Sequence, residues 1–420
     1  MARQIYILIY GLLLPFIFAR LWWRGRKNPQ YRLRWAERLG VVIRPEVGQP
    51  PLWIHAVSVG ETVAAAPLLE KLLLSHPDLP VLITTMTPTG SDRVRSLFGN
   101  RVTHCYAPYD LPFCVNRFLD RIQPRAVVIM ETELWPNWIH CCQQREIPVV
   151  LANGRLSAKS AAGYAKFSAL IRPMLRSLSW LAVQEDSHAK RFIALGAHEN
   201  ALSVIGNIKF DLQLSADLSQ KAGLLREQWG EQRPVLVAGS THEGEELLLL
   251  DTFTKLQRDD DRLLLIIVPR HPERFSAVKD LLNLQSWSFA VWSDSNRSLR
   301  NAQVLLVDTM GELLNFYAAA DIAIVGGSFI NRGGHNPLEP AALAVPVVMG
   351  RSVFNFQDIC DQLLAVGALE LTSYEALGEA LAALLADRSR RQSSGAAGRR
   401  YIDANRGALN RLYSGLQRYL

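Results

Sequence analysis

Residues 126–137, AVVIMETELWPN, contain the pattern that decides the fold. Ala126–Met130 is an apolar run of strand length, and two carboxylates and a proline follow it at once. A continuous apolar run without alternation is typical of a parallel strand that is covered on both faces. Similar short runs alternate with longer helical patterns along the chain, and this alternation predicts an α/β fold with parallel sheets.

Two sets of such runs flank a polar stretch near residues 211–232, which predicts two doubly wound, Rossmann-like lobes in tandem. The first set comprises Leu52–Val59, Val81–Thr85, Val102–Tyr106, Ala126–Met130, Val149–Ala152, Leu181–Gln184 and Ser203–Ile205. The second comprises Val235–Ala238, Leu263–Val268, Phe289–Trp292, Val304–Val307, Ile322–Val325 and Val345–Met349. We expect ligands in a cleft between the lobes, at the carboxyl ends of the strands.

This pattern divides the chain into four expected parts. Residues 1–27 would be a membrane anchor with a basic collar, and residues 28–207 the N-terminal lobe. Residues 208–390 would form the C-terminal lobe, and residues 391–420 a helical tail that packs back on the lobes.

The composition excludes several protein classes. The 420 residues are 49% hydrophobic and 20% charged, unlike a disordered or collagen-like chain. Five cysteines without a C-x-x-C pair exclude a disulfide framework and disfavour a cysteine metal site. The formal charge is +7, and residues 1–38 alone hold eight basic residues and one acid. The rest of the chain is therefore neutral in sum, and we expect no nucleic-acid partner.

An apolar segment followed by basic residues opens the chain. Ile5–Ala19 carries no charge and would span about 22 Å as a helix, short of the ~30 Å hydrocarbon core, whereas extension to Trp23 nearly reaches it. A cleaved signal peptide is disfavoured, because the basic residues follow the apolar run and no A-x-A site occurs. The positive-inside rule places the chain behind Arg24–Arg38 in the cytoplasm. We expect a membrane anchor, spanning or interfacial, with an ordinary buried helix as the alternative.

Carboxylates follow two predicted strands of the first lobe. Glu61 comes after the first run of that lobe, before a helix predicted from Thr62. The N-terminus of that helix favours an ionised carboxylate, so Glu61 is either a base near neutral pH or a group that merely complements the helix dipole. Glu131 and Glu133 follow Ala126–Met130 and would emerge at the same edge. They could share acid–base work, hold sugar hydroxyls or cap the next helix.

Basic residues stand at two further places. Lys209 lies at the predicted hinge, where it could neutralise charge, although its position alone fits an ordinary surface lysine as well. Arg270 follows the run Leu263–Val268, between Pro269 and the nearby Pro272. A guanidinium held in such a short, rigid loop suits phosphate recognition.

The strongest local pattern is the glycine-rich stretch of residues 326–340, GGSFINRGGHNPLEP. Glycines let a backbone approach an anion closely, Asn336 can cap a helix, and Pro337 fits the first helical position. A helix N-terminus prepared in this way can bind phosphate, and Glu339 could accept hydrogen bonds from ribose hydroxyls. Met310–Glu312, after another strand, could present further backbone N–H groups.

Two common nucleotide motifs do not occur in the sequence. No Walker A loop is present, and no G-x-G-x-x-G follows the first strand, which disfavours ATP hydrolysis and dinucleotide redox chemistry. Asp259–Asp261 falls at the amino end of a predicted strand, opposite the expected cleft, and is interpreted as a solvated turn. We therefore expect no metal and no cofactor.

Seven motifs together closely resemble the bacterial 3-deoxy-D-manno-octulosonic acid (Kdo) transferase family. They are WIHAVSVGE (53–61), METELWPN (130–137), NGRLS (153–157), STHEGEE (240–246), VPRHPERF (268–275), DTMGEL (308–313) and GGHNPLEPAA (333–342). The resemblance covers nearly the whole chain, including the apolar N-terminus and its basic collar. One departure is Gly154, where relatives often have alanine, and it falls at no catalytic position.

The resemblance implies a GT-B fold that binds the acceptor on the first lobe and CMP-Kdo on the second. It implies an inverting, metal-independent glycosyltransferase of lipopolysaccharide inner-core biosynthesis, which moves Kdo from CMP-Kdo to lipid IVA, the lipid A precursor, two residues in succession. Glu61 matches the proton acceptor of the family, and Glu131 and Lys209 match its transition-state stabilisers. The positions that match its CMP-binding segments are Pro269, Arg270, Met310, Gly311, Glu312, Asn336, Pro337, Leu338 and Glu339.

The same resemblance places the enzyme at the bacterial inner membrane with its lobes in the cytoplasm. Its expected partners are CMP-Kdo, lipid IVA and the membrane lipids around residues 5–23 and the collar. Two alternatives stay open on the residues alone: another GT-B nucleotide-sugar enzyme, such as a UDP-sugar transferase or epimerase, and a non-catalytic, membrane-tethered binding protein.

Overall fold

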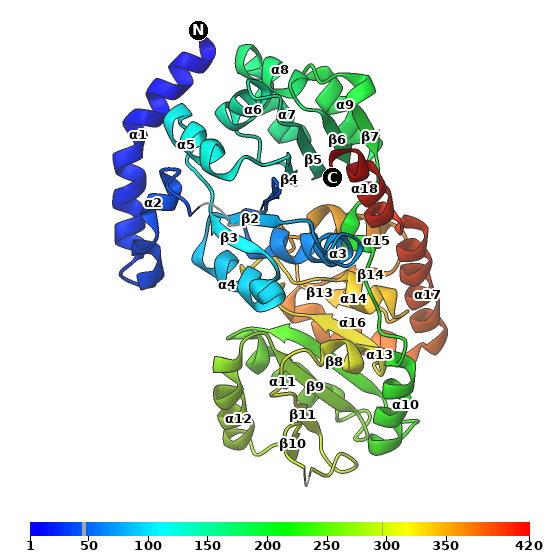
Figure 1. The fold of residues 1–420 in the computed structure, drawn as a ribbon. Helices are drawn as coiled ribbons and strands as arrows, with labels where there is room; N and C mark the ends of the chain where they lie inside the picture. Colours follow the sequence, from blue (N-terminus) through cyan, green and yellow to red (C-terminus); the bar gives the residue numbers. More distant parts are fainter. Residues whose placement is uncertain (44–47, 296) are drawn as a thin grey trace. The chain divides into compact units, whose positions relative to one another are not determined.

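The chain folds into two compact units in a computed structural model that describes residues 1–43, 48–295 and 297–420. Unit 1 comprises Met1–Asp211 together with Arg406–Leu420, and unit 2 comprises Leu212–Asn405. Each unit is built around one seven-stranded parallel sheet with helices on both of its faces (Figure 1). The prediction of two doubly wound α/β lobes is confirmed.

The sheet of unit 1 has the strand order β3-β2-β1-β4-β5-β6-β7. Its strands are β1 (Leu52–His55), β2 (Val81–Thr85), β3 (Thr103–Tyr106), β4 (Ala126–Met130), β5 (Val149–Gly154), β6 (Trp180–Val183) and β7 (Leu202–Val204). Its helices are α1 (Ala2–Arg24), α2 (Trp35–Arg38), α3 (Val59–Ser75), α4 (Pro88–Phe98), α5 (Pro112–Ile122), α6 (Pro136–Gln143), α7 (Ala158–Ala165), α8 (Ser168–Arg176), α9 (Asp186–Ala194) and α18 (Ala408–Leu416).

Alternate residues of the central strands in unit 1 enter two separate cores. On β1, Trp53 packs with Phe118 and Trp138 on one face, whereas Leu52 and Ile54 belong to the core on the other face. Strands that are buried on both sides need apolar residues at every position, because successive side chains point to opposite faces. This requirement explains why these runs show no polar alternation in the sequence.

The C-terminal helix α18 completes one face of this sheet. Its residues Leu412 and Leu416 are fully buried in the core that contains Leu68 of α3. Its first turn is held by Asp211, whose carboxylate accepts the backbone N–H groups of Gly407 at 2.6 Å and Leu409 at 2.7 Å. A carboxylate at a helix N-terminus satisfies free N–H groups and complements the helix dipole.

The sheet of unit 2 has the strand order β10-β11-β9-β8-β12-β13-β14. Its strands are β8 (Val235–Thr241), β9 (Leu264–Pro269), β10 (Phe289–Val291), β11 (Val304–Leu306), β12 (Ile322–Val325), β13 (Val347–Met349) and β14 (Leu369–Leu371). Its helices are α10 (Leu218–Trp229), α11 (Glu245–Leu256), α12 (Phe275–Leu284), α13 (Leu313–Ala318), α14 (Leu338–Ala342), α15 (Gln357–Ala365), α16 (Tyr374–Ala386) and α17 (Arg388–Asn405).

The structure departs from the sequence-based boundaries at several places. Helix α3 begins at Val59, so the predicted first strand ends early, at His55. The short edge strand β14 was not predicted, because Leu369–Leu371 lacks a long apolar run. Residues 391–420 were expected to form one tail, but they are divided between the two units, because α17 belongs to unit 2 and α18 to unit 1. The boundary between the lobes was expected after residue 207, but the two compact units divide after Asp211.

Candidate active site

Both sheets have a topological switch point, where the winding direction reverses. It lies between β1 and β4 in unit 1, and between β8 and β12 in unit 2. In unit 1 the helices that leave these strands, α3 and α6, pack on opposite faces of the sheet. A gap therefore opens beyond the two strand ends, and doubly wound proteins bind their ligands there. Glu61 and Glu131 follow β1 and β4, and the loops that carry His242 and His335 follow β8 and β12.

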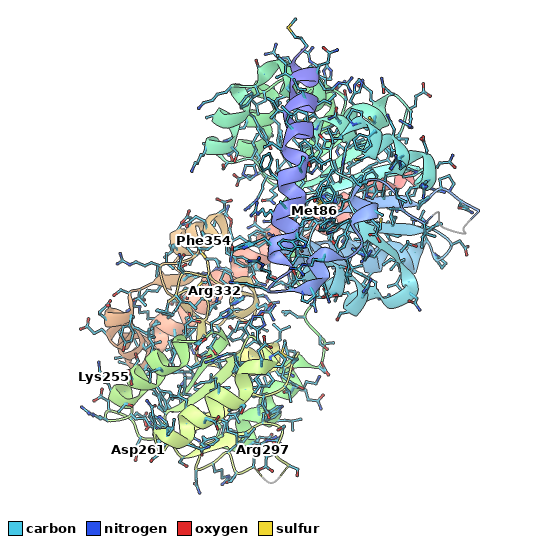
Figure 2. The ribbon with its side chains drawn as sticks, turned by 90° about the vertical axis from the view of Figure 1, so that its left-hand side faces the viewer. Met86, Lys255, Asp261, Arg297, Arg332 and Phe354 are labelled. Atoms are coloured by element: carbon cyan, nitrogen blue, oxygen red, sulfur yellow. The ribbon has the colours of Figure 1, made fainter. Side chains whose placement is uncertain are left out.

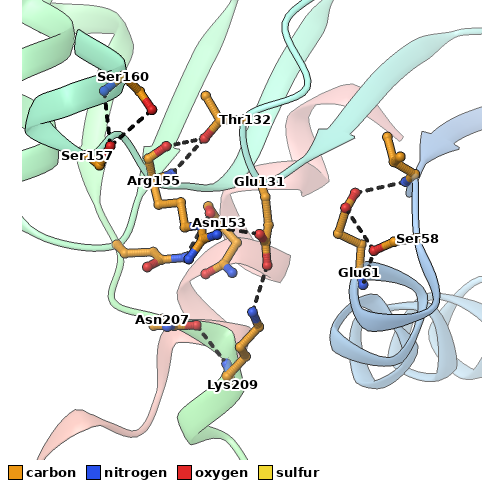
Figure 3. Close-up of polar contacts among 12 residues, drawn as sticks. Ser58, Glu61, Glu131, Thr132, Asn153, Arg155, Ser157, Ser160, Asn207 and Lys209 are labelled. Atoms are coloured by element: carbon orange, nitrogen blue, oxygen red, sulfur yellow. Dashed lines mark hydrogen bonds and ion pairs between the residues drawn. The ribbon is translucent and has the colours of Figure 1, made fainter. Parts of the chain in front are cut away.

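Glu61 lies in the first turn of α3, not in a loop before the helix. Ser58 is the N-cap, and its Oγ accepts the Glu61 backbone N–H at 3.4 Å. The Glu61 carboxylate accepts the Val57 N–H at 2.8 Å and the Ser58 hydroxyl at 3.1 Å (Figure 3). These reciprocal bonds are of the capping-box kind. Glu61 therefore takes part in capping its own helix, a role that the sequence analysis did not consider for it.

Burial decides the protonation of Glu61. Its pKa is raised from 4.5 to about 7, first by burial and then by the negative charges of Glu131 and Glu133, against the opposing effect of the Val57 N–H bond. The sequence-based argument expected the helix N-terminus to favour the ionised form, but desolvation outweighs it. A carboxyl group with a pKa near 7 can accept a proton under neutral conditions and release it again.

Glu131, Lys209 and Arg155 form one charged cluster (Figure 3). Lys209 Nζ lies 2.8 Å from Glu131 Oε1, and Arg155 Nε lies 3.4 Å from Glu131 Oε2. The Glu131 side chain is only 13% exposed, so solvent screens these ion pairs less than it would at the surface. The structure thus brings the predicted residues Glu131 and Lys209 into contact. With two cations on one carboxylate, the cluster carries a net positive charge.

Two residues with left-handed backbones shape this cluster. Glu131, directly after β4, and Asn153, near the end of β5, both have φ of 55°. This conformation is uncommon for residues other than glycine, although asparagine tolerates it better than most. A glutamate held there costs on the order of 1 kcal/mol, and such strain is concentrated at functional sites.

Asn153 connects β5 to the segment that carries Lys209. Its side chain is fully buried, and its Oδ1 accepts the Ile208 N–H at 3.1 Å. Asn207 Oδ1 accepts the Lys209 N–H at 3.0 Å, so the short turn Ile208–Phe210 is fixed by two side chains. Within the described residues, the buried Asn153 Nδ2 has no hydrogen-bond partner.

Sequence reasoning missed Asn153 and Arg155 as site residues. Both belong to the quoted motif NGRLS, at and after the end of β5. Strand β5 is the neighbour of β4 in the sheet. The strand-end argument that selected Glu131 would have selected these two residues if it had been applied to the next strand.

In unit 2, Arg270 leaves the carboxyl end of β9, whose last residue is Pro269. The Arg270 N–H donates to the Thr241 carbonyl at 3.0 Å, which fixes this loop against the end of β8. A short turn, Pro272–Arg274, follows at once. The loop is therefore short and held at both ends, as the two prolines predicted.

A buried carboxylate holds the glycine-rich loop beside β8. The fully buried Glu245 accepts the His242 N–H at 3.0 Å and the Gly327 N–H at 2.7 Å through Oε2. Its Oε1 accepts the Phe329 N–H at 3.1 Å. Burial raises the pKa of Glu245, and these backbone bonds oppose that rise by stabilising the charged form. Glu245 was quoted in the motif STHEGEE but was not recognised as the residue that ties the two loops together.

The predicted nucleotide residues after β12 form one short turn. Asn336 Oδ1 accepts the Leu338 N–H at 3.1 Å, and Asn336 Nδ2 donates to Glu339 Oε1 at 3.1 Å. Helix α14 begins at Leu338, one residue after Pro337, and has only five residues. Asn336 therefore closes this turn with its side chain, but the N-cap of the short helix α14 is Pro337, so the predicted cap and first helical position are each one residue too early. Burial raises the pKa of Glu339, against the effect of the Asn336 bond.

The loop Met310–Glu312 follows β11, the neighbour of β9. Gly311 has φ of 90°, which only glycine adopts without strain. Met310 is 54% exposed, and Glu312 Oε2 accepts the Asn315 side-chain amide at 2.7 Å at the start of α13. This loop is therefore an exposed platform at the same edge of the sheet as Arg270.

In the part of the chain that the structure describes, no group of three or more His, Cys, Asp or Glu side chains could hold a metal ion. Asp260 accepts hydrogen bonds from the Arg262 guanidinium at 2.7 and 2.9 Å. Within unit 2, Asp261 lies at the end of the unit remote from Arg332 (Figure 2). Arg332 belongs to the loop after β12, so the run Asp259–Asp261 is far from the strand carboxyl ends.

Helix α1 presents an uncovered apolar face. It is long and apolar enough to cross a membrane, and only 6% of its apolar window is buried. One side packs on unit 1, where the rings of Phe18 and Tyr109 are 5.6 Å apart and Leu21 is buried. The other side exposes Leu8 (64%), Leu12 (66%) and Phe16 (72%).

Comparisons with known proteins agree on one family. Residues 33–212 match the family model described as 3-deoxy-D-manno-octulosonic-acid transferase (kdotransferase). The chain is 43% identical to the 3-deoxy-D-manno-octulosonic acid transferase of Haemophilus influenzae, over 100% of this chain and 99% of the relative. It is 36% identical to the protein of the same name from Bordetella pertussis, over 100% of both chains.

A solved structure shares the fold. The UDP-GlcNAc 2-epimerase from Neisseria meningitidis, bound to UDP-GlcNAc, is similar with a TM-score of 0.56 and 15% identity, over 87% of this chain and 99% of that one. At this identity the similarity shows the fold alone.

The Asn153 bond leads to a stability prediction. Asn153→Ala should lower the free energy of unfolding by about 1–3 kcal/mol, because the buried Ile208 N–H loses its acceptor. Alanine also adds left-handed strain, so Asn153→Gly should lose about 1 kcal/mol less. Urea unfolding followed by tryptophan fluorescence measures both. If Asn153→Ala were as stable as the wild type, the hydrogen bond between Asn153 and Ile208 would contribute nothing to stability.

Proposed function

The chain belongs to the Kdo transferase family and is a glycosyltransferase that transfers Kdo in lipopolysaccharide biosynthesis, and we propose that it takes Kdo from CMP-Kdo and adds it to lipid IVA. We further propose that two Kdo residues are added in succession. Its fold is of the GT-B type. The observation that supports the reaction most directly is the half-buried Glu61, with a pKa near 7, at the switch point of unit 1.

Glu61 is the proposed proton acceptor. An acceptor hydroxyl on the glucosamine of lipid IVA gives its proton to the Glu61 carboxylate as its oxygen attacks the anomeric carbon of Kdo with inversion. The bond between Kdo and the phosphate breaks, and its electron pair leaves with CMP. A base whose pKa is close to the working pH suits this step, because it is substantially ionised and still basic.

Positive groups are proposed to stabilise the charge that develops in this step. Lys209, oriented by Glu131, carries a fixed charge at the switch point of unit 1. Arg270 provides a guanidinium at the strand ends of unit 2, where the phosphate of CMP would bind. Preorganised charges of this kind stabilise a transition state without reorganisation, so we propose a transfer that needs no metal ion.

The remaining contacts to the nucleotide are proposed from the loops of unit 2. The turn Asn336–Glu339 offers a backbone closed by the Asn336 side chain and a partly buried carboxylate, which suit a ribose and a phosphate. Met310–Glu312 offers an exposed backbone after β11, the neighbour of the strand β9 that leads to Arg270. The acceptor is proposed to bind on unit 1.

Helix α1 is the proposed anchor in the inner membrane, with the lobes on the cytoplasmic side. Its exposed face is apolar along its length, and Trp22 and Trp23 lie at the end where the basic residues begin. Tryptophan prefers the membrane interface, and basic residues prefer the cytoplasmic leaflet with its anionic lipids. The lipid acceptor would reach the enzyme from the same membrane.

The first test is product formation. The purified protein with CMP-Kdo and lipid IVA should give lipid IVA carrying two Kdo residues in mass spectrometry, and UDP-sugars should give no product. Glu61→Gln should lower the rate about 10²–10⁴-fold, because it removes the base, while CMP binding stays unchanged. Glu70→Gln on the same helix, where Glu70 binds Arg101 at the surface, should keep the wild-type rate.

Two different results would contradict two different parts of this proposal. Absence of product from CMP-Kdo would overturn the assigned donor or acceptor. A nearly wild-type rate for Glu61→Gln would overturn the base and leave the reaction in place.

The second test is the pH dependence of kcat/KM. Glu61 must be deprotonated to act, and its pKa is about 7, so the rate should fall as the pH drops through 7. Glu133→Gln removes a negative charge that raises this pKa, so the acid limb should move to lower pH. An acid limb that stays in place, or moves to higher pH, would contradict the assignment of this limb to Glu61.

The third test concerns the anchor. Replacing Leu8, Leu12 and Phe16 together by asparagine should reduce binding to vesicles of phosphatidylethanolamine and phosphatidylglycerol at least about tenfold, because each residue loses about 1.5–3 kcal/mol of apolar burial. Sedimentation with the vesicles measures this. A control with asparagine at the exposed Leu74, Leu224 and Leu284 should bind like the wild type. Equal binding of both variants would exclude this face as the anchor.

A further inference from the structure

Two histidines form a hydrogen-bonded pair at the switch point of unit 2. His242 follows the end of β8, His335 lies in the loop after β12, and these strands are neighbours in the sheet. Their Nε2 atoms are 2.8 Å apart, and their rings are nearly parallel, with an interplanar angle of 12°. In such a bond, one Nε2 carries a proton and donates, while the other Nε2 is bare and accepts.

The backbone on both sides of the pair is fixed. The His242 N–H donates to the buried Glu245, and the His335 N–H donates to the Gly326 carbonyl at 3.0 Å. Gly327 leaves room for the rings, since a Cβ on it would lie 3.0 Å from His335 Cδ2 and 3.2 Å from His335 Nε2. The contact is therefore built by three segments of unit 2.

The surroundings of the pair are positive. Arg270, His271, Arg274 and Arg332 lower the pKa of His242, and Arg270 and His271 lower that of His335. Burial is the larger cause in both cases, and the pKa values fall to about 4 and about 3. The nearby carboxylates are engaged: Glu245 by backbone N–H groups, Glu246 by Arg274, and Glu339 by Asn336. At neutral pH the pair is therefore uncharged. The cations around it attract negative charge, which a bound anion would supply.

One added proton changes what the pair offers to a ligand. The neutral pair has one protonated Nδ1 and one bare Nδ1, because each ring holds a single proton. A further proton goes to the bare Nδ1 and leaves the bond between the Nε2 atoms intact. Both Nδ1 atoms are then donors, and neither has a hydrogen-bond partner among the described residues. Because the Nε2 atoms are 2.8 Å apart and the ring centroids 5.0 Å apart, the two Nδ1 atoms lie at the outer ends of the pair and point away from each other. One N–H donor together with the positive charge is therefore what the pair offers to an oxygen of a phosphate dianion.

We propose that the His242–His335 pair binds the phosphate of the leaving nucleotide and takes up one proton from solvent as it does so. This inference rests on the proposed CMP-Kdo donor. When the bond between Kdo and the phosphate breaks, its electron pair converts the singly charged diester to a doubly charged monoester. The proton on the pair balances the added charge, and it returns to solvent when CMP leaves. The acceptor proton goes separately to Glu61.

The test is proton uptake on binding CMP. The full-length protein in detergent is titrated with CMP at pH 7.5 by calorimetry, in buffers of different ionisation enthalpy. Free CMP is then almost entirely a dianion, because its second pKa is near 6, so an uptake belongs to the protein. We expect about half a proton or more per CMP, since a bound anion raises the pKa of a histidine beside it. Cytidine, which has no phosphate, should bind without uptake.

Variants assign the proton to the pair. His242→Gln and His335→Gln should each remove the uptake and weaken CMP at least tenfold, while cytidine binding stays unchanged and reports an intact fold. His198→Gln, at an exposed histidine of unit 1, should keep the wild-type uptake.

The outcomes are distinct. CMP binding to the wild type without uptake would overturn the inference even if no variant folds, and so would an uptake that survives both substitutions. Absence of CMP binding to the wild-type protein would instead overturn the proposed donor.

Discussion

Both units depend on one constraint of parallel β-structure. Every strand must end at the same edge of its sheet, and every crossover must be right-handed, so a reversal of winding leaves two neighbouring strand ends without a helix over them. The strands supply mainly apolar residues, as β1 does with Leu52–Ile54, and buried polar ones such as His55 and Thr84 bond to each other inside the sheet. The candidate site residues lie at the strand ends or just beyond them. In unit 1 these are Glu61 and Glu131, and in unit 2 they are His242 and His335.

Burial controls the charges at both edges more strongly than helix termini do. Glu61 receives two hydrogen bonds at the start of α3, and its pKa is nevertheless raised, because desolvation and the nearby Glu131 and Glu133 outweigh them. His242 and His335 are kept neutral in the same way, with surrounding cations adding to the effect of burial. Each edge therefore holds groups that titrate away from their usual range, as an enzyme that moves a proton requires.

The sequence predicted much of this fold and part of the site. Buried strands such as Val81–Thr85 and Ala126–Met130 were located to the residue, because a double-sided burial leaves an unbroken apolar run. Glu61, Glu131 and Arg270 were found because each follows a recognisable strand. Asn153, Arg155 and the histidine pair were missed as site residues. The positions of Asn153 and Arg155 at a strand end could have been found by the same argument. The pairings themselves, such as Asn153 with Ile208 and His242 with His335, join distant segments and are not encoded in a local pattern. The sequence also does not predict the left-handed backbones at Glu131 and Asn153.

The position of α18 has a consequence for synthesis. Residues 212–405 separate this helix from the rest of unit 1, and at ribosomal speed they take about 10 to 40 s to be made. Throughout that time the surface that later receives Leu412 and Leu416 has no cover, and Asp211 has no helix to cap. The first unit to emerge from the ribosome is thus the last to be completed. A nascent chain of this protein must remain in an unfinished state, apolar on one face, until α18 has left the exit tunnel.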